Sequence, residues 1–414
     1  MSVGTFIVMI WRSSEMIVSQ EYLNTGIFFG MGMAKLTFMK RLIFLSFYTV
    51  IGAAICFGTL SCSNRTKTTE KIATDSSKHE ATSLKDTIGS AKFPPLPIDY
   101  DKTKVLKNMY VVDRAGVEFR QGAAKDAPVL GKYSYGTKLD IIGEEGEWFA
   151  IMDRIQRDYN GANGETGDVT QWEKVYVAKS KLGKQDKITI SPKELNSIVS
   201  INVNGKETYY EKGHALDQYL HLELIDEQTF LAAQKTAKDY LIKDTLTYTK
   251  NGKILELPLT NGRKLTFTDK DIDNELESRF FYKGHYDFLN AFAIEGNYWE
   301  SADVRLFDRQ DGHLIVECGD YPLFSPDLKY LVTLHADPYE STGDLQLFHV
   351  KQGKVTSLFF ISFKEWMPTW KPELMFWGKD GSIYTAANHI NGYWGEDGSL
   401  SDRAQFIRIK ILEH

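Results

Sequence analysis

Residues 105–182 contain the feature that most limits how this chain can fold. Short runs of alternating apolar and polar residues occur at 117–123, 128–131, 135–143 and 146–151, separated by glycine-containing turns about ten residues apart. Alternation with a period of two places every second side chain on one face of a strand. Several such strands joined by tight turns form a small antiparallel barrel. We therefore predict mainly β structure, with a small barrel over residues 104–185.

The same residues resemble the bacterial SH3 (SH3b) family. The family's successive blocks are present as apolar-x-apolar-Arg-x-Gly at 117–122, Val-x-Gly at 129–131, Gly-Thr-x-apolar at 136–139 and Gly-x-Trp-apolar-x-apolar at 146–151. This chain departs from the family pattern in two places. Where the family closes with Gly-Trp-Val this chain has Val175-Tyr176-Val177, and residues 153–172 insert a polar, glycine-rich loop before that strand. The resemblance implies an SH3-like barrel that binds cell-wall peptides or protein segments and does not catalyse a reaction.

Aromatic side chains of this barrel and its inserted loop are the candidate ligand contacts, although at least half of the barrel aromatics are expected in the core. The candidates are Tyr135, Trp148, Tyr159, Trp172 and Tyr176. Trp148 and Phe149 are adjacent, so on a strand they face opposite ways. We expect one of the two to be buried and the other to be partly exposed.

The C-terminal half, residues 244–414, is predicted to be a β-repeat domain. Asn251-Gly252 and Asn261-Gly262 are hairpin turn signals. The segment 303–307 is similar to 344–348, and 322–328 to 368–374, which is a spacing of 41 and 46 residues. A period of about 40–50 residues with several strands per unit is typical of propeller blades. We expect units at about 282–318, 319–363 and 364–411, with a possible fourth at 244–280, arranged as a propeller-like ring or as irregular stacked sheets.

One turn in this half resembles the Ser-Pro-Asp-Gly-Lys turn of TolB-type and WD40-like propellers. It reads Ser325-Pro326-Asp327-Leu328-Lys329, with Leu328 in place of the glycine. The polar, glycine-rich segment 388–395 is a further candidate surface site, with His389, Tyr393 and Trp394 as its ligand contacts.

Between the two β regions, residues 186–243 are predicted to form a mixed linker. An apolar pattern over 229–242, preceded by the N-cap carboxylate of Asp226, predicts one linking helix.

The N-terminal region reads as a targeting signal. Met39-Lys40-Arg41 precedes an apolar run over 42–57, as in a secretory signal peptide, here predicted over 39–61. Leu60-Ser61-Cys62 resembles a bacterial lipobox, with Thr59 where the family most often has leucine, and this implies lipidation of Cys62. The run of about 16 residues is short for a spanning helix, which favours cleavage over an uncleaved signal anchor. Residues 1–38 are interpreted as an early assigned start or a short extension.

Residues 62–103 are predicted to be a disordered tether between the lipid anchor and the barrel. From 63 to 91 the chain lacks aromatic residues and is rich in Ser, Thr, Lys, Glu and Asp, so it cannot bury enough apolar surface to fold. Pro94, Pro95 and Pro97 stiffen its end. We expect a location in the bacterial cell envelope, anchored by lipid to a membrane, either periplasmic or surface-exposed.

Composition and motifs exclude several functions. The net charge of −6 argues against a nucleic-acid partner. Three cysteines make neither a disulfide framework nor a cysteine-rich zinc site, and Cys318 on an expected strand is interpreted as a core thiol. Carboxylates near 308–311 and 397–402 are interpreted as turn residues. No zinc-helix, nucleophile-elbow or phosphate-loop motif occurs, so we expect no catalytic residue, no metal and no cofactor.

Together these features predict a non-catalytic envelope lipoprotein that binds a cell-wall peptide or an envelope protein. Two alternatives remain at this stage. One is a cell-wall hydrolase with carboxylates that the sequence does not single out, and the other is an exported inhibitor or immunity protein.

Overall fold

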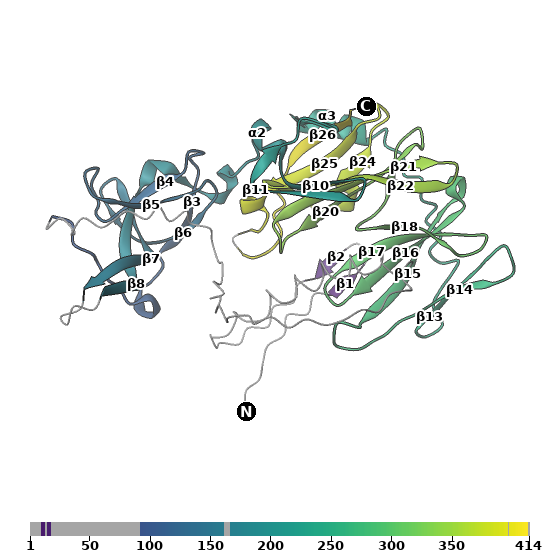
Figure 1. Ribbon diagram of the computed structural model, residues 1–414, viewed down its shortest axis with the longest axis horizontal. Coiled ribbons are helices and arrows are strands. Elements are labelled where there is room, and N and C mark those ends of the chain that lie inside the picture. Colours follow the sequence, from purple (N-terminus) through teal and green to yellow (C-terminus); the bar gives the residue numbers. More distant parts are fainter. Residues whose placement is uncertain (1–9, 13–14, 18–91, 161–165, 396, 413–414) are drawn as a thin grey trace, which may run out of the picture. The chain divides into compact units, whose positions relative to one another are not determined.

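The computed structural model describes residues 10–12, 15–17, 92–160, 166–395 and 397–412 (Figure 1). These residues are mainly β, as predicted. The predicted signal peptide 39–61 and Cys62 lie outside the described residues. Within the predicted extension 1–38, β1 (Ile10–Arg12) pairs antiparallel with β2 (Glu15–Ile17).

The region predicted as a barrel, residues 104–185, forms one antiparallel sheet of seven strands, which we call the barrel sheet, in the order β5-β4-β8-β7-β6-β3-β9. All seven strands contribute to one apolar core that includes Val111, Phe119, Ile141 and Val175. A sheet whose strands all face a single core must curve around it. β5 and β9 end the path, so no pairing between described strands closes the barrel. The strands are β3 (Lys107–Val111), β4 (Val117–Arg120), β5 (Val129–Tyr133), β6 (Lys138–Glu145), β7 (Trp148–Asn160), β8 (Thr166–Ala178) and β9 (Leu182–Gly183).

The inserted segment 153–172 differs from the predicted loop. β7 and β8 pair without interruption, from Trp148 opposite Ala178 to Asn160 opposite Thr166. The insertion therefore lengthens a hairpin. Glu173 is fully buried at its base, where Arg157 donates to both carboxylate oxygens at 2.9 and 2.8 Å. This paired charge anchors the longest hairpin of the sheet to its core.

The end of the predicted tether is ordered. The backbone N–H of Ile98 donates to Trp172 O at 2.9 Å, and that of Lys174 donates to Leu96 O at 2.9 Å. The segment 96–98 therefore lies along the edge of β8 that β4 leaves unpaired. The predicted disorder is therefore wrong for residues 92–103. Composition alone gives no sign that the backbone of this segment hydrogen-bonds to β8. Residues 62–91 lie outside the described part of the chain.

The described residues from 186 to 412 form four further antiparallel sheets (Figure 1). The first is the hairpin of β13 (Ile254–Pro258) and β14 (Lys264–Thr268). The second contains β15 (Ser278–Tyr286), β16 (Ala291–Tyr298), β17 (Ala302–Asp308) and β18 (Leu314–Cys318). The third contains β10 (Ser197–Val203), β11 (Lys206–Ala215), β19 (Leu323–Phe324), β20 (Tyr330–Asp337), β21 (Thr342–Lys351) and β22 (Lys354–Phe363). The fourth contains β12 (Leu220–Ile225), β23 (Trp366–Pro368), β24 (Met375–Trp377), β25 (Ile383–His389) and β26 (Gln405–Ile411).

Apolar cores join these sheets in a line, first to second, second to third and third to fourth. Leu257 and Phe292 belong to the first core, and Leu306 and Leu331 to the second. The third core joins Leu345 of β21 to Ile407 of β26. Among the described residues no core joins the first sheet to the fourth. The arrangement is thus the stacked-sheet alternative, and not a ring closed by an apolar core.

Part of the internal similarity has a structural counterpart. Segments 303–307 and 344–348 lie on β17 and β21, each the third strand of a four-strand meander. Asn261-Gly262 forms the predicted hairpin turn between β13 and β14, with Gly262 at φ 84°. Asn251-Gly252 does not join two strands, because residues 245–248 form none, and the unit at 244–280 has only a two-stranded sheet.

The predicted linker 186–243 supplies strands to two sheets. β10 pairs with β22, and β12 pairs with β26. Its helix α3 (Glu227–Gln234) is capped by Asp226, whose carboxylate accepts from Thr229 N at 2.8 Å. The helix ends before the predicted residue 242, because Leu241 packs into the core between the second and third sheets and Ile242 pairs with His285.

Short helical segments complete the fold. They are α2 (Pro192–Leu195), η1 (Tyr100–Lys102), η2 (Lys179–Lys181), η3 (Gln185–Lys187), η4 (Asp287–Leu289), η5 (Pro372–Leu374) and η6 (Ile390–Gly392).

Helix α3 covers the outer face of the fourth sheet, and this predicts a stability effect. Phe230 is fully buried against Phe376, Tyr384 and Phe406. Phe230→Ala should lower the free energy of unfolding by about 3–5 kcal/mol, since it opens a cavity in that core. The neighbouring Leu231, 41% exposed, is the matched control, and Leu231→Ala should cost less than about 1 kcal/mol. Equal losses in urea unfolding would contradict this role of the helix.

Candidate binding site

The eight candidate ligand residues fall into two groups in the structure. The Tyr135 ring contacts the His389 ring, and Tyr393 and Trp394 follow that histidine by four and five residues in the sequence. Trp148, Tyr159, Trp172 and Tyr176 instead belong to the β7–β8 hairpin. The first group connects the turn after β5 with the end of β25, two places far apart in the sequence.

His389 is buried at the end of β25. Its Nδ1 accepts a hydrogen bond from Asn391 N at 3.1 Å, so the ring proton lies on Nε2. The ring of Tyr135 meets the imidazole edge-on at a centroid distance of 5.3 Å. Burial lowers the pKa of His389 to about 4, so the imidazole is neutral at pH 7.

Arg114 holds the Tyr135 turn in place, and sequence reasoning missed it. Its guanidinium lies 4.4 Å from the centroid of the Tyr135 ring and donates to both carboxylate oxygens of Glu194 at 2.5 and 2.6 Å. The Tyr135 hydroxyl accepts from Thr189 N at 2.8 Å, and Asn391 Nδ2 donates to Tyr135 O at 3.1 Å. One turn of the barrel sheet is thus fixed to both chain segments that border the site.

Glu194 receives support from its own helix as well. Burial alone would raise the pKa of Glu194, but hydrogen bonds from Ser191 and Arg114 outweigh burial and keep this pKa below its ordinary value. Ser191 and Glu194 form the capping box of α2. A charged Glu194 is therefore available to Arg114 at neutral pH.

A pocket of about 210 Å³ lies beside His389. One wall is the segment around η3, including Asp186 and Thr189, and the other includes Asn388, Arg403 and Gln405. The Gln405 amide ties the walls together, since its Oε1 accepts from Ile190 N at 2.5 Å and its Nε2 donates to Ile190 O at 3.0 Å. The pocket thus offers hydrogen-bonding groups and one exposed charge of each sign, Asp186 and Arg403.

Within the 388–395 segment the structure corrects the expected exposure. Of the three candidate ligand residues, His389 and Tyr393 are buried, at 3% and 4% exposure, and Trp394 alone is exposed, at 39%. The Gln185 side chain donates to Trp394 O, so this segment is also attached to the η3 wall.

The second group of aromatics has structural partners. Phe149 is buried and Trp148 is half-buried, as the alternation predicted. Trp172 stacks on Tyr100 at a centroid distance of 4.5 Å. Tyr176 is buried, and its hydroxyl donates to Glu145 at 2.7 Å. The side chain of Tyr159 lies outside the described part of the molecule. This hairpin offers less free aromatic surface than the sequence suggested.

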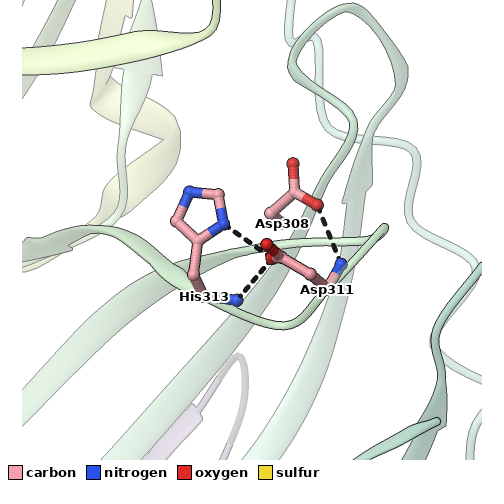
Figure 2. A group of neighbouring side chains, drawn as sticks. All are labelled: Asp308, Asp311 and His313. Carbon is pink, nitrogen blue, oxygen red and sulfur yellow. Dashed lines mark hydrogen bonds and ion pairs between the residues drawn. The ribbon is translucent and has the colours of Figure 1, made fainter. Parts of the chain in front are cut away.

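The carboxylates near residue 308 serve a turn. Asp308 Oδ1 accepts from Gln310 N at 2.6 Å. Figure 2 shows Asp308 Oδ1 accepting from Asp311 N at 3.2 Å, and Asp311 Oδ1 accepting from His313 N at 3.0 Å and lying 2.7 Å from His313 Nδ1. Hydrogen bonds from the His313 backbone and side chain hold the pKa of Asp311 below its ordinary range. These hydrogen bonds hold the turn between β17 and β18. Asp397 accepts from Ser399 in the same way, and Asp402 pairs with Lys371.

Cys318 has the properties of a core residue. It lies on β18 with no exposed surface, and burial strongly raises the pKa of its thiol. A thiol kept protonated is a poor nucleophile, which argues against a cysteine mechanism at this position.

Comparison with protein-family models, with curated proteins and with solved structures finds no match to this chain. In the residues that the structure describes, no helix is long and apolar enough to cross a membrane.

The buried His389 predicts a pH effect on stability. Its pKa is lowered from 6.5 to about 4 on folding, so between these values the unfolded chain binds more protons and stability falls as the pH falls. From about pH 6.5 to pH 5 the loss should be about 1–2 kcal/mol from this residue alone. His389→Asn keeps an acceptor for Asn391 N and should remove this part of the pH dependence.

Urea unfolding at the two pH values measures the effect. His221→Asn, on the exposed side of β12, is the matched control and should leave the pH dependence unchanged. An unchanged pH dependence in His389→Asn would contradict the burial argument.

Proposed function

We propose that this protein is a non-catalytic lipoprotein of the bacterial cell envelope that binds a cell-wall peptide or an envelope protein. The observation that supports it most is the pocket beside His389, whose walls are hydrogen-bonded to each other and to the Tyr135 turn. Lipid anchoring through Cys62 and the envelope location rest on the lipobox resemblance. The acidic net charge of −6 disfavours nucleic acid as a partner.

The size of the pocket favours part of a chain as ligand. At about 210 Å³ it is smaller than the roughly 300–1,000 Å³ of ordinary small-molecule sites, so it suits one residue or chain end of a larger molecule. Arg403 on one wall suits a carboxylate, and Asp186 on the other suits an amine. Wall peptides carry both groups, so we favour a wall peptide over a neutral ligand.

A binding role also fits the chemistry of the pocket. His389 Nδ1 already accepts a hydrogen bond from a backbone amide, and the side chain is only 3% exposed. The imidazole is therefore poorly placed to act as a general base. Its neutral ring is a wall of the pocket and not a proton carrier at pH 7.

Co-sedimentation of the full chain with purified peptidoglycan sacculi tests the proposal. The wild-type chain should sediment with the sacculi and release no soluble fragments. Arg403→Gln should weaken sedimentation by about tenfold, since a charge-assisted hydrogen bond contributes about 1.5 kcal/mol. Lys410→Gln, on an exposed position of β26, is the control and should bind like the wild type.

Three results would contradict parts of this proposal. Released muropeptides would show a hydrolase. Capture of an envelope protein without sedimentation would exclude the wall as ligand and favour the protein partner. Equal sedimentation of Arg403→Gln and wild type would place the binding site elsewhere.

A further inference from the structure

A second pocket, of about 200 Å³, lies between two equivalent turns of neighbouring sheets. One turn joins β19 to β20, where Ser325 N donates to Tyr330 O at 2.9 Å. The other joins β24 to β25, where Gly378 N donates to Ser382 O at 2.8 Å. Both turns place a residue in the left-handed region, Leu328 at φ 58° and Gly381 at φ 75°. Since backbone hydrogen bonds fix these turns, the pocket is formed before any ligand arrives.

The floor of this pocket is aromatic. Phe324 and Trp377 are both 3% exposed, and Tyr240 and Pro326 lie beside them. The Trp377 Nε1 proton is donated to Leu323 O at 2.9 Å, and the Tyr240 hydroxyl donates to Pro326 O at 3.0 Å. Because their polar atoms are occupied, these side chains offer a ligand only apolar ring surface.

The rim carries positive charge. Lys238 and Lys379 both line the pocket, and neither forms an ion pair with a carboxylate in the part of the chain that the structure describes. The nearest acidic residues in sequence have other partners. Asp239 pairs with Lys243 at 2.9 Å, Asp327 pairs with Lys329 at 3.2 Å, and Asp380 accepts from Ser382 Oγ at 3.0 Å. Lys238 Nζ lies 4.5 Å from the centroid of the Tyr240 ring, and no carboxylate of the described residues neutralises either ammonium group.

We propose that this pocket binds a small aromatic carboxylate. The ring would lie on the Trp377 and Phe324 floor, where ring contacts are favourable, and the carboxylate would accept from Lys238 and Lys379. The volume admits a group of about one ring and its acid and excludes a nucleotide-sized ligand. This site shares no residue with the pocket beside His389, so it does not depend on the function proposed above.

Calorimetric titration of the full chain with 3-phenylpropionate tests this site. The dissociation constant should be of order 1 mM, as for a ligand of this size. The neutral 3-phenylpropanamide should bind about tenfold more weakly, and so should acetate, which lacks the ring. Lys238→Gln and Lys379→Gln should each weaken binding about threefold, and the double variant about tenfold.

Lys329→Gln is the matched control, since Lys329 lies on the β19–β20 turn that borders the pocket but pairs with Asp327 and does not line the pocket. It should bind 3-phenylpropionate like the wild type. Equal affinity for the acid and its amide would overturn the role of the lysines. Full affinity in the double variant, or no binding by the wild type, would overturn the site itself.

Discussion

The Arg114 guanidinium joins two parts of the chain that fold around separate cores. It lies on the Tyr135 ring of the barrel sheet and reaches both oxygens of Glu194, which caps the first helix after that sheet. The planar guanidinium of arginine can stack on an aromatic ring and donate two hydrogen bonds to a carboxylate at the same time, which the ammonium group of lysine cannot do. Because Tyr135 in turn bonds Thr189 and Asn391, the pocket beside His389 depends on this contact for the position of both walls.

The stacked sheets supply the rigid part of that arrangement. The fourth sheet is covered on one face by the third sheet and on the other by α3, so every residue of β25 is buried. His389 stands at the end of this strand, where it is held more firmly than a loop residue would be. The same layering buries Trp366 of β23. Its Nε1 donates to Leu195 O at 3.1 Å and so links β23 to α2.

Local patterns predicted a large part of the fold. Alternation predicted the strands of the barrel sheet, Asn261-Gly262 predicted the β13–β14 hairpin, and Asp226 predicted the start of α3. Contacts between residues far apart in the sequence were not predicted. The β12–β26 pairing joins residues almost two hundred positions apart, and Arg114 lies 80 residues from Glu194. Segment 153–172 looked like a loop because its strands are polar, yet their pairing with each other holds them extended. For the site, the sequence singled out Tyr135 and His389 but gave no signal that they meet.

Hydrogen exchange of the full chain, with and without muropeptides prepared from peptidoglycan, tests most directly the claim that the pocket beside His389 is the binding site. The account predicts slower exchange of backbone amides at 185–191 and 401–405, the two walls of the pocket, when the muropeptides are present. Protection confined to the β7–β8 hairpin would assign binding to the barrel sheet instead and contradict this account. Unchanged exchange throughout would contradict wall-peptide binding altogether.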